Sequence, residues 1–327
     1  MDITAINEKI REKSSFVDAL KQEIGKKVIA QDTMVERILI ALFSNGHILL
    51  EGVPGLAKTL TVTTVAEALD VSFKRIQFTP DLLPADLTGS LIYDTRSGDF
   101  IAKKGPVFAN IILADEVNRA PAKVQSAMLE AMQEKQVTLG NETYHLPKPF
   151  FVLATQNPIE QEGTYPLPEA QTDRFMLKVK VGYPTIEEEK KILSLYGTTT
   201  NIPVSRVLNP AAIDDVRAAI EEVYVDDGIK DYILRIVFAT RFPERYKLNK
   251  LKQFIDFGGS PRASLYLLKA AKAHAFLQRR GYVVPDDIKE MSFDVLRHRI
   301  IASFEAEAEG MTTDDIIREI LANIEVP

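Results

Sequence analysis

Short apolar runs alternate with helical stretches between about residues 46 and 181. The apolar runs are HILLEG, VSFKRIQF, ANIILADE, PFFVLATQ and RFMLKVKV. This alternation predicts an α/β fold, a mostly parallel sheet with helices on both faces. Ahead of the first run, apolar periodicity predicts helices over residues 5–24 and 32–43, and we expect both to pack on the flank of the sheet.

The pattern changes after Val181, where helical periodicity replaces the apolar runs and almost no strand is expected. Thr185 is a suitable N-cap ahead of three glutamates, and further helices are expected to begin at Ser260-Pro261, after Pro285 and after Thr312 or Thr313. The sequence therefore predicts an α/β domain over residues 1–183 and a smaller, all-helical domain over residues 184–327.

Two short segments interrupt the α/β pattern and are typical of β-hairpins. In the first, LIY and FIA flank DTRSGD; in the second, QVTL and TYHL flank Gly140-Asn141, a pair that suits a two-residue turn. We expect both to project from the surface. From the residues alone, each hairpin could equally be a simple connection or a functional projection.

Composition limits the class of protein. With 327 residues, 46% of them hydrophobic and 26% charged, the chain is typical of an ordinary globular protein of two domains. It contains no apolar run of the roughly 18 residues that cross a bilayer. The charged start MDITAINEKIREK lacks a secretory pattern, so we expect a cytoplasmic protein without a membrane span.

Cysteine content and charge exclude or disfavour further classes. The absence of cysteine excludes disulfides, zinc-thiolate sites and iron-sulfur clusters, and four histidines leave little scope for a histidine metal centre. Forty basic residues against 46 acidic ones give a net charge of −6, which does not favour a nucleic-acid partner. A local basic patch on an acidic protein could still bind one.

A glycine-containing loop stands between the first apolar strand and a helical run. It reads Gly52, Val53, Pro54, Gly55, Leu56, Ala57, Lys58, Thr59, and the helix continues from Leu60. Backbone N–H groups in such a loop wrap phosphates, and the helix N-terminus adds a favourable dipole. Lys58 would reach the terminal phosphates and Thr59 would ligate magnesium. Ala57 replaces the usual glycine, and alanine fits at this position if the backbone there is ordinary helical.

Two carboxylates, Asp115 and Glu116, end a buried-type strand. Because the carboxyl ends of parallel strands meet at one edge of a sheet, they should lie beside the phosphate loop. Asp115 would hold magnesium, largely through water, and Glu116 would polarise the attacking water. The alternative is an acidic helix cap after a core strand.

The next apolar strand ends in Gln156-Asn157-Pro158. A neutral amide such as that of Asn157 can orient a water or the terminal phosphate without changing the local charge. An Asn-Pro pair by itself is more often only a turn.

Phosphoryl transfer also needs arginine, because negative charge spreads over the transferring oxygens. Arg174 precedes the fifth strand, Arg262 lies in the first turn of the helix that begins at Ser260-Pro261, and Arg119 is a weaker third candidate. Each could instead be a surface ion-pair residue.

Five segments together resemble the MoxR family of AAA+ ATPases: EGVPGLAKT, ILADEVNRAP, ATQNP, LPEAQTDRF and GGSPRAS. They occur in family order from residue 51 to residue 264, and the helical remainder is similar to the family's lid. The resemblance implies a P-loop NTPase core that uses ATP and Mg²⁺. It assigns Walker A to Gly52–Thr59, Walker B to Asp115 and Glu116, sensor 1 to Asn157, an arginine finger to Arg174, and sensor 2 to Arg262.

The resemblance also reaches the base side of the nucleotide and the two hairpins. Val28-Ile29-Ala30-Gln31 resembles the adenine-side segment of AAA+ proteins, which implies base contacts by Val28, Ile29 and Gln31; Ala30 stands where glycine is common. The hairpins match, in place, inserts that line or face the pore of related rings. The family implies a hexameric ring, a chaperone-like role on client complexes, and a partner with a von Willebrand factor A domain.

Three hypotheses about function follow. The first is an ATP-hydrolysing remodeller whose active site is completed between subunits, so that Arg174 acts on the nucleotide of its neighbour. The second is a nucleotide-gated binding module with little turnover, in which ATP shifts assembly. The third is a DNA-associated helicase-like or chelatase-like motor, to which Arg96, Lys103 and Lys104 of the first hairpin would contribute; such modest basic character is usually a solvated surface. The residue pattern does not specify the client or the ring size.

Overall fold

The computed structural model describes residues 3–96, 98–158, 163–197 and 202–327. The chain divides into two compact units. One contains residues 16–175 and 179–214, and is called here the α/β unit. The other contains residues 1–15, 176–178 and 215–327, and is called the helical unit.

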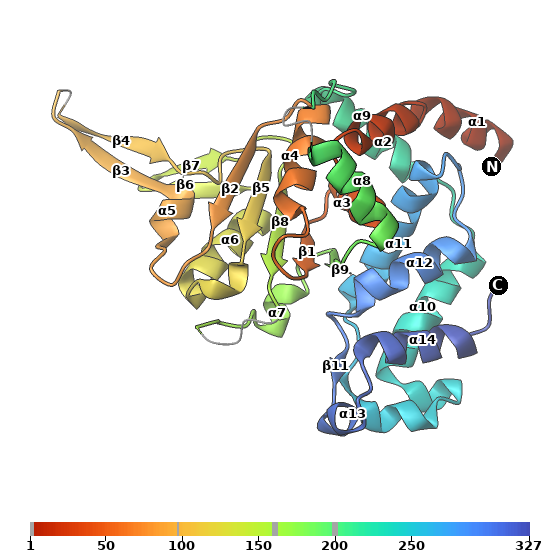
Figure 1. The fold of residues 1–327 in the computed structure, drawn as a ribbon. Coiled ribbons are helices and arrows are strands. Elements are labelled where there is room, and N and C mark those ends of the chain that lie inside the picture. Colours follow the sequence, from red (N-terminus) through yellow and green to blue (C-terminus); the bar gives the residue numbers. More distant parts are fainter. Residues whose placement is uncertain (1–2, 97, 159–162, 198–201) are drawn as a thin grey trace. The chain divides into compact units, whose positions relative to one another are not determined.

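A five-stranded sheet forms the centre of the α/β unit, in the order β2-β5-β8-β1-β9 (Figure 1). The strands are β1 (Ile48–Glu51), β2 (Phe73–Gln77), β5 (Ile111–Asp115), β8 (Phe151–Gln156) and β9 (Leu177–Lys180), and they confirm all five predicted runs. The pairs β2–β5, β5–β8 and β8–β1 are parallel. In β5 and β8 nearly every side chain is buried, so both faces of the sheet are covered, as the continuous apolar runs predict.

The helices of the α/β unit are α2 (Phe16–Gly25), α3 (Asp32–Phe43), α4 (Lys58–Ala68), α5 (Pro84–Thr88), α6 (Ala122–Glu134), α7 (Glu169–Thr172) and α8 (Ile186–Tyr196). Helix α4 contacts β2 and β5 of the sheet. On one face, Met128 and Met132 of α6 belong to the same buried cluster as Leu49, Ile112 and Val152 of the sheet. Helix α8 begins with the predicted cap, because the Thr185 hydroxyl accepts the N–H of Glu188 and the Glu188 carboxylate accepts that of Thr185.

Both predicted hairpins are present and lie side by side (Figure 1). The first joins β3 (Gly89–Asp94) to β4 (Asp99–Lys104), with residue 97 of its turn outside the described residues, and the second joins β6 (Gln136–Leu139) to β7 (Glu142–His145). Gly140, at the turn of the second hairpin, has a φ of +63° and leaves no room for a Cβ beside the side chain of Leu91. The β3–β4 hairpin therefore packs, through Leu91, on the turn of the second hairpin.

The helical unit contains α10 (Asp227–Arg241), α11 (Pro261–Leu277), α12 (Pro285–Leu296), α13 (Phe304–Glu309) and α14 (Thr313–Asn323). It also has 3-10 turns at Pro243–Tyr246 and Asn249–Phe254 and one short pair of strands, β10 (Ile255–Phe257) with β11 (Ile301–Ala302). Helix α9 (Pro210–Glu221) contains the point at which the two units divide. The predicted starts of α11 and α14 are confirmed, with Ser260 and Thr312 as side-chain caps.

The N-terminal segment differs from the prediction of a single helix over residues 5–24. Helix α1 (Ile3–Lys13) ends where the Ser14 hydroxyl bonds the carbonyl of Ile10, and α2 starts afresh at Phe16. Helix α1 belongs to the helical unit, where the side chain of Asn7 accepts the N–H of Gly281. The expectation that the whole segment packs on the sheet is therefore wrong for its first half. Among the helices that the structure describes, none is long and apolar enough to cross a membrane.

Candidate functional site

The loop Gly52–Thr59 connects β1 to α4 at the carboxyl edge of the sheet. Two of its positions require special backbone. A Cβ at Gly52 would come within 2.8 Å of the carbonyl oxygen of Val181, and Gly55 has a φ of +87°. The loop is thus held close to the segment at Val181 at one end and turns sharply at Gly55.

Ala57 is not in ordinary helical conformation. Its φ of 56° and ψ of 20° are left-handed, so the condition under which alanine would fit without strain is not met. Ala30, in the segment that resembles the adenine side, also has a positive φ, of 66°. The left-handed region costs an alanine roughly 1–2 kcal/mol, and glycine occupies it freely. The chain therefore keeps the backbone shape that glycine favours at both positions and tolerates the strain.

A cavity of about 370 Å³ lies against this loop and collects most of the predicted site. Its lining residues are Pro54, Gly55, Leu56, Ala57, Lys58, Thr59, Leu60, Arg75, Asp115, Glu116, Thr155 and Asn157. The loop, the two carboxylates and the predicted sensor amide thus meet at one edge of the sheet, as the parallel strand order requires. The expected position of Asp115 and Glu116 beside the loop is confirmed, and Asn157 lies in the same cavity.

Lys58 is the cation at the centre of this cavity. Its ammonium donates a hydrogen bond to the carbonyl of Gly52 at 2.5 Å. Burial lowers the pKa of Lys58 from its ordinary value of 10.5, although the opposite charges of Asp115 and Glu116 act to raise it. Without an anionic ligand, the half-buried ammonium is thus incompletely compensated. An arriving phosphate would supply the missing negative charge.

Thr155, near the end of β8, joins the two carboxylate residues. Its hydroxyl donates to Asp115 Oδ1 at 2.6 Å and accepts the backbone N–H of Glu116 at 2.8 Å. Glu116 has a left-handed φ of 56°. The hydroxyl therefore fixes both the Asp115 carboxylate and the turn that carries Glu116. Thr155 was not predicted from the sequence, although its place at the end of a buried strand, two residues before Asn157, is a usable signal.

Arg75 and Gln77 of β2 were also missed. The guanidinium of Arg75 donates to Asp115 Oδ2 twice, from Nε at 3.0 Å and from Nη2 at 2.6 Å. Gln77 donates to Glu116 Oε2 at 2.8 Å, and Arg119 donates to the same oxygen at 3.1 Å. Alternate positions on a strand beside β5 face the same side as Asp115, which is the signal that the sequence carried.

The three predicted arginines lie in different places. Arg119 pairs with Glu116 in the cavity. Arg174, in the turn between α7 and β9, is partly exposed and is not among the described residues that line the cavity. Arg262 belongs to the helical unit, in the first turn of α11, where its N–H bonds the hydroxyl of Ser260.

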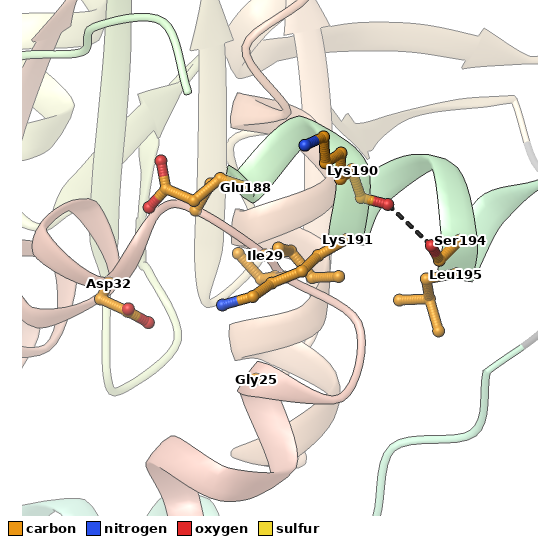
Figure 2. A pocket seen from close by; sticks show the side chains of 10 residues that line it. Gly25, Ile29, Asp32, Glu188, Lys190, Lys191, Ser194 and Leu195 are labelled. Carbon is orange, nitrogen blue, oxygen red and sulfur yellow. Dashed lines mark hydrogen bonds between the residues drawn. The ribbon is translucent and has the colours of Figure 1, made fainter. Parts of the chain in front are cut away.

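A second cavity, of about 660 Å³, lies between the Val28–Ala30 segment and helix α8 (Figure 2). It is lined by Gly25, Val28, Ile29, Ala30, Asp32, Glu188, Lys190, Lys191, Ser194 and Leu195. Figure 2 shows the side chain of Ile29 beside that of Lys191, with Asp32 and Glu188 at one end. Gln31 is buried at the start of α3 and is not among the lining residues that are described.

The donor set fits magnesium only together with a phosphate ligand. Among the residues that the structure describes, no group of three or more His, Cys, Asp or Glu side chains could hold a metal ion. Near the loop, the oxygen ligands are Asp115 and the hydroxyl of Thr59. Magnesium prefers few protein ligands, with waters and phosphate oxygens completing its shell. The residues present therefore fit a metal that arrives with a polyphosphate.

Comparison with known proteins gives matches over both units. The family model described as "ATPase family associated with various cellular activities (AAA)" matches residues 47–177, and the one described as "AAA lid domain" matches residues 251–320. A crystal structure of a candidate ATPase from Cytophaga hutchinsonii superposes with a TM-score of 0.93 at 50% identity. It covers 100% of this chain and 99% of that one.

Curated relatives are similar over nearly the full chain. Chaperone MoxR1 of Mycobacterium tuberculosis is 47% identical over 93% of this chain and 81% of its own length. The uncharacterized protein YeaC of Bacillus subtilis is 44% identical over 94% of this chain and 93% of its own length. Protein MoxR of Methylorubrum extorquens is 28% identical, over 94% of both.

Proposed function

The chain belongs to the MoxR family of AAA+ ATPases, and from this premise we propose that it binds and hydrolyses ATP with Mg²⁺ to remodel client protein complexes. One observation carries the proposal. Lys58, Asp115, Glu116 and Asn157, which lie on three different segments, line one cavity at the mouth of the glycine-containing loop. Cation, metal ligand, base and amide in one cavity are what phosphoryl transfer to water requires.

ATP would bind with its phosphates in the loop. The backbone N–H groups of the loop after Pro54 and the N-terminus of α4 would contact an anion there, and Lys58 would exchange the carbonyl of Gly52 for the terminal phosphates. We assign the adenine ring of ATP to the second cavity, with Val28 and Ile29 as lining residues. Gln31 would act through the backbone turn at Ala30, since its side chain is buried.

Thr59 and Asp115 would hold the magnesium, Asp115 largely through water. The metal, when bound, neutralises charge on the phosphate oxygens. Glu116 would accept a proton from the attacking water, and the Asn157 amide would orient that water. Thr155 holds Asp115 and the backbone of Glu116 at fixed positions, so these groups need little rearrangement for the reaction.

The remaining requirement is positive charge on the transferring phosphate. We propose that the subunits form a hexameric ring in which Arg174 supplies this charge to the nucleotide of the neighbouring subunit. Arg262 would supply positive charge from the helical unit. The two hairpins would then face the client, and a protein with a von Willebrand factor A domain would be the partner. The cytoplasmic location stays a prediction.

Turnover tests this proposal directly. Purified protein at high concentration, with ATP and Mg²⁺, should release phosphate, whereas Glu116→Gln should bind ATP and release almost none. A parent rate no higher than that of Glu116→Gln would overturn hydrolysis. Retained ATP binding in that outcome would favour a nucleotide-gated binding module instead.

A further inference from the structure

The Asp115 carboxylate already has a donor on each oxygen. Thr155 donates to Oδ1 at 2.6 Å, and Arg75 donates to Oδ2 through both Nε and Nη2. The partner on Oδ2 is a permanently charged guanidinium, which forms short and strong hydrogen bonds with carboxylates. Arg75 thus occupies the carboxylate that the proposed function assigns to magnesium.

A metal and Arg75 would compete for this carboxylate, because both are cations and Oδ2, with two guanidinium donors, has no lone pair left for the metal. A magnesium held directly by Asp115 takes a lone pair, and one held through water places a water O–H on the carboxylate. Because Thr155 is buried and also fixes the Glu116 backbone, Oδ1 is the oxygen with the immobile partner. Oδ2 is the one whose partner can move, since the Arg75 side chain is 49% exposed.

We propose that Arg75 is a resident counter-cation that leaves Asp115 when the metal binds, so that the ion pair and metal binding exclude each other. This inference rests on the proposed function, because it needs a metal at Asp115. Arg75 is a positioning residue here and touches no reacting atom. A half-exposed ion pair is weak, so the metal can displace it, yet the pair keeps the carboxylate neutralised until then.

The same guanidinium connects the metal position to the general base. Arg75 Nη2 donates to Gln77 Oε1 at 2.7 Å, and Gln77 Nε2 donates to Glu116 Oε2 at 2.8 Å. When Arg75 withdraws, the Gln77 carbonyl loses the donor that holds its amide against Glu116. Metal arrival at Asp115 would therefore also loosen one of the two donors on Glu116 Oε2, and the bond from Arg119 would remain.

Competition predicts that removal of Arg75 strengthens metal binding. The metal is best measured as Mn²⁺, whose free and bound forms are distinguished by electron paramagnetic resonance, on ADP-loaded full-length protein. Arg75→Ala should lower the apparent Mn²⁺ dissociation constant by roughly three- to tenfold, the range expected for loss of a half-exposed, bidentate competitor. Arg75→Lys keeps the charge without the planar fork and should lie between Arg75→Ala and the parent.

Lys74→Ala is the matched control. Lys74 is the adjacent residue of β2 and lies on the opposite face of the strand, so its removal takes away one positive charge without touching Asp115. This variant should leave the Mn²⁺ dissociation constant within about twofold of the parent value, because solvent and salt largely screen an exposed charge on the opposite face of the strand. Melting followed by circular dichroism checks that each variant is folded. Arg75→Gln replaces Arg75→Ala if the alanine variant does not fold.

Unchanged or weaker Mn²⁺ binding in Arg75→Ala would overturn the inference, as would an equal gain in Lys74→Ala. Failure of the proposed function has a different signature. If the parent binds no Mn²⁺ with ADP, or if Asp115→Asn binds it as tightly as the parent, the metal assignment itself is wrong. If the parent binds Mn²⁺ and Asp115→Asn loses it, while Arg75→Ala is unaffected, only the inference about Arg75 fails.

Discussion

Replacing Ala57 with glycine should stabilise the α/β unit, although alanine-to-glycine substitutions usually destabilise proteins. Ala57 has a φ of 56°, in the left-handed region that carries a penalty for every residue with a Cβ. Ala57→Gly removes that penalty and leaves the backbone contacts of the loop in place, including the hydrogen bond from the N–H of Thr61.

The magnitude follows from two opposing terms. Relief of the left-handed conformation contributes roughly 1–2 kcal/mol. The greater freedom of glycine in the unfolded chain subtracts about 0.4–1 kcal/mol. The net expectation is a stabilisation of about 0.5–1 kcal/mol, which corresponds to a rise of about 1–4 °C in the melting temperature of a unit of this size.

Calorimetry of nucleotide-free protein measures this shift, and Gly25→Ala is the matched comparison. A Cβ at Gly25 meets nothing within 4 Å, and its φ is not in the positive range. Gly25→Ala should therefore stabilise by about 0.4–1 kcal/mol through the unfolded state alone. At position 57, in contrast, glycine should give the more stable protein than alanine. If Ala57→Gly lowers the melting temperature, the reasoning about strain in this loop is refuted.

Three further results are expected. Thr155→Val should lower the free energy of unfolding by about 2–3 kcal/mol, because it deprives Asp115 and a backbone N–H of their partner, and Thr155→Ser should restore it in urea denaturation. Lys58→Met should stabilise nucleotide-free protein at pH 7, because burial of the charged lysine destabilises the folded protein and lowers the pKa of Lys58. This destabilisation is complete where the lysine is charged in both the folded and the unfolded protein. The difference in stability between variant and parent should therefore fade as pH rises through the lowered pKa towards 10.5. Asp287→Asn should lower the stability of the helical unit by about 3 kcal/mol in thermal melts, because it breaks a buried ion pair with Arg280.

The sequence predicted the sheet well because each strand is a continuous apolar run followed by a turn or a helix start. The confirmed caps at Thr185, Ser260 and Thr312 show that local side-chain chemistry also determines where helices begin. The break at Ser14 was missed because apolar periodicity continues across it. At the break the Ser14 hydroxyl donates to the carbonyl of Ile10, a local bond that apolar periodicity does not reveal.

Within the site, the residues in loop and strand-end motifs could be predicted, whereas their supporting partners could not. Arg75 and Gln77 lie on a strand whose exposed, alternating pattern is ordinary for an edge strand, and only strand order places them beside Asp115 and Glu116. The backbone at Ala57 could not be predicted, because residue preference favours helical alanine and the constraint of the loop overrides it.

ATP binding by Lys58 tests the central claim most directly. Isothermal titration of ATP with Mg²⁺ into Glu116→Gln protein, with and without the added change Lys58→Ala, measures binding in the absence of turnover. Loss of a charged hydrogen bond to phosphate should weaken binding by about tenfold or more. Equal affinity in the two proteins would contradict the account, because the triphosphate would then lie somewhere other than the loop that Lys58 ends.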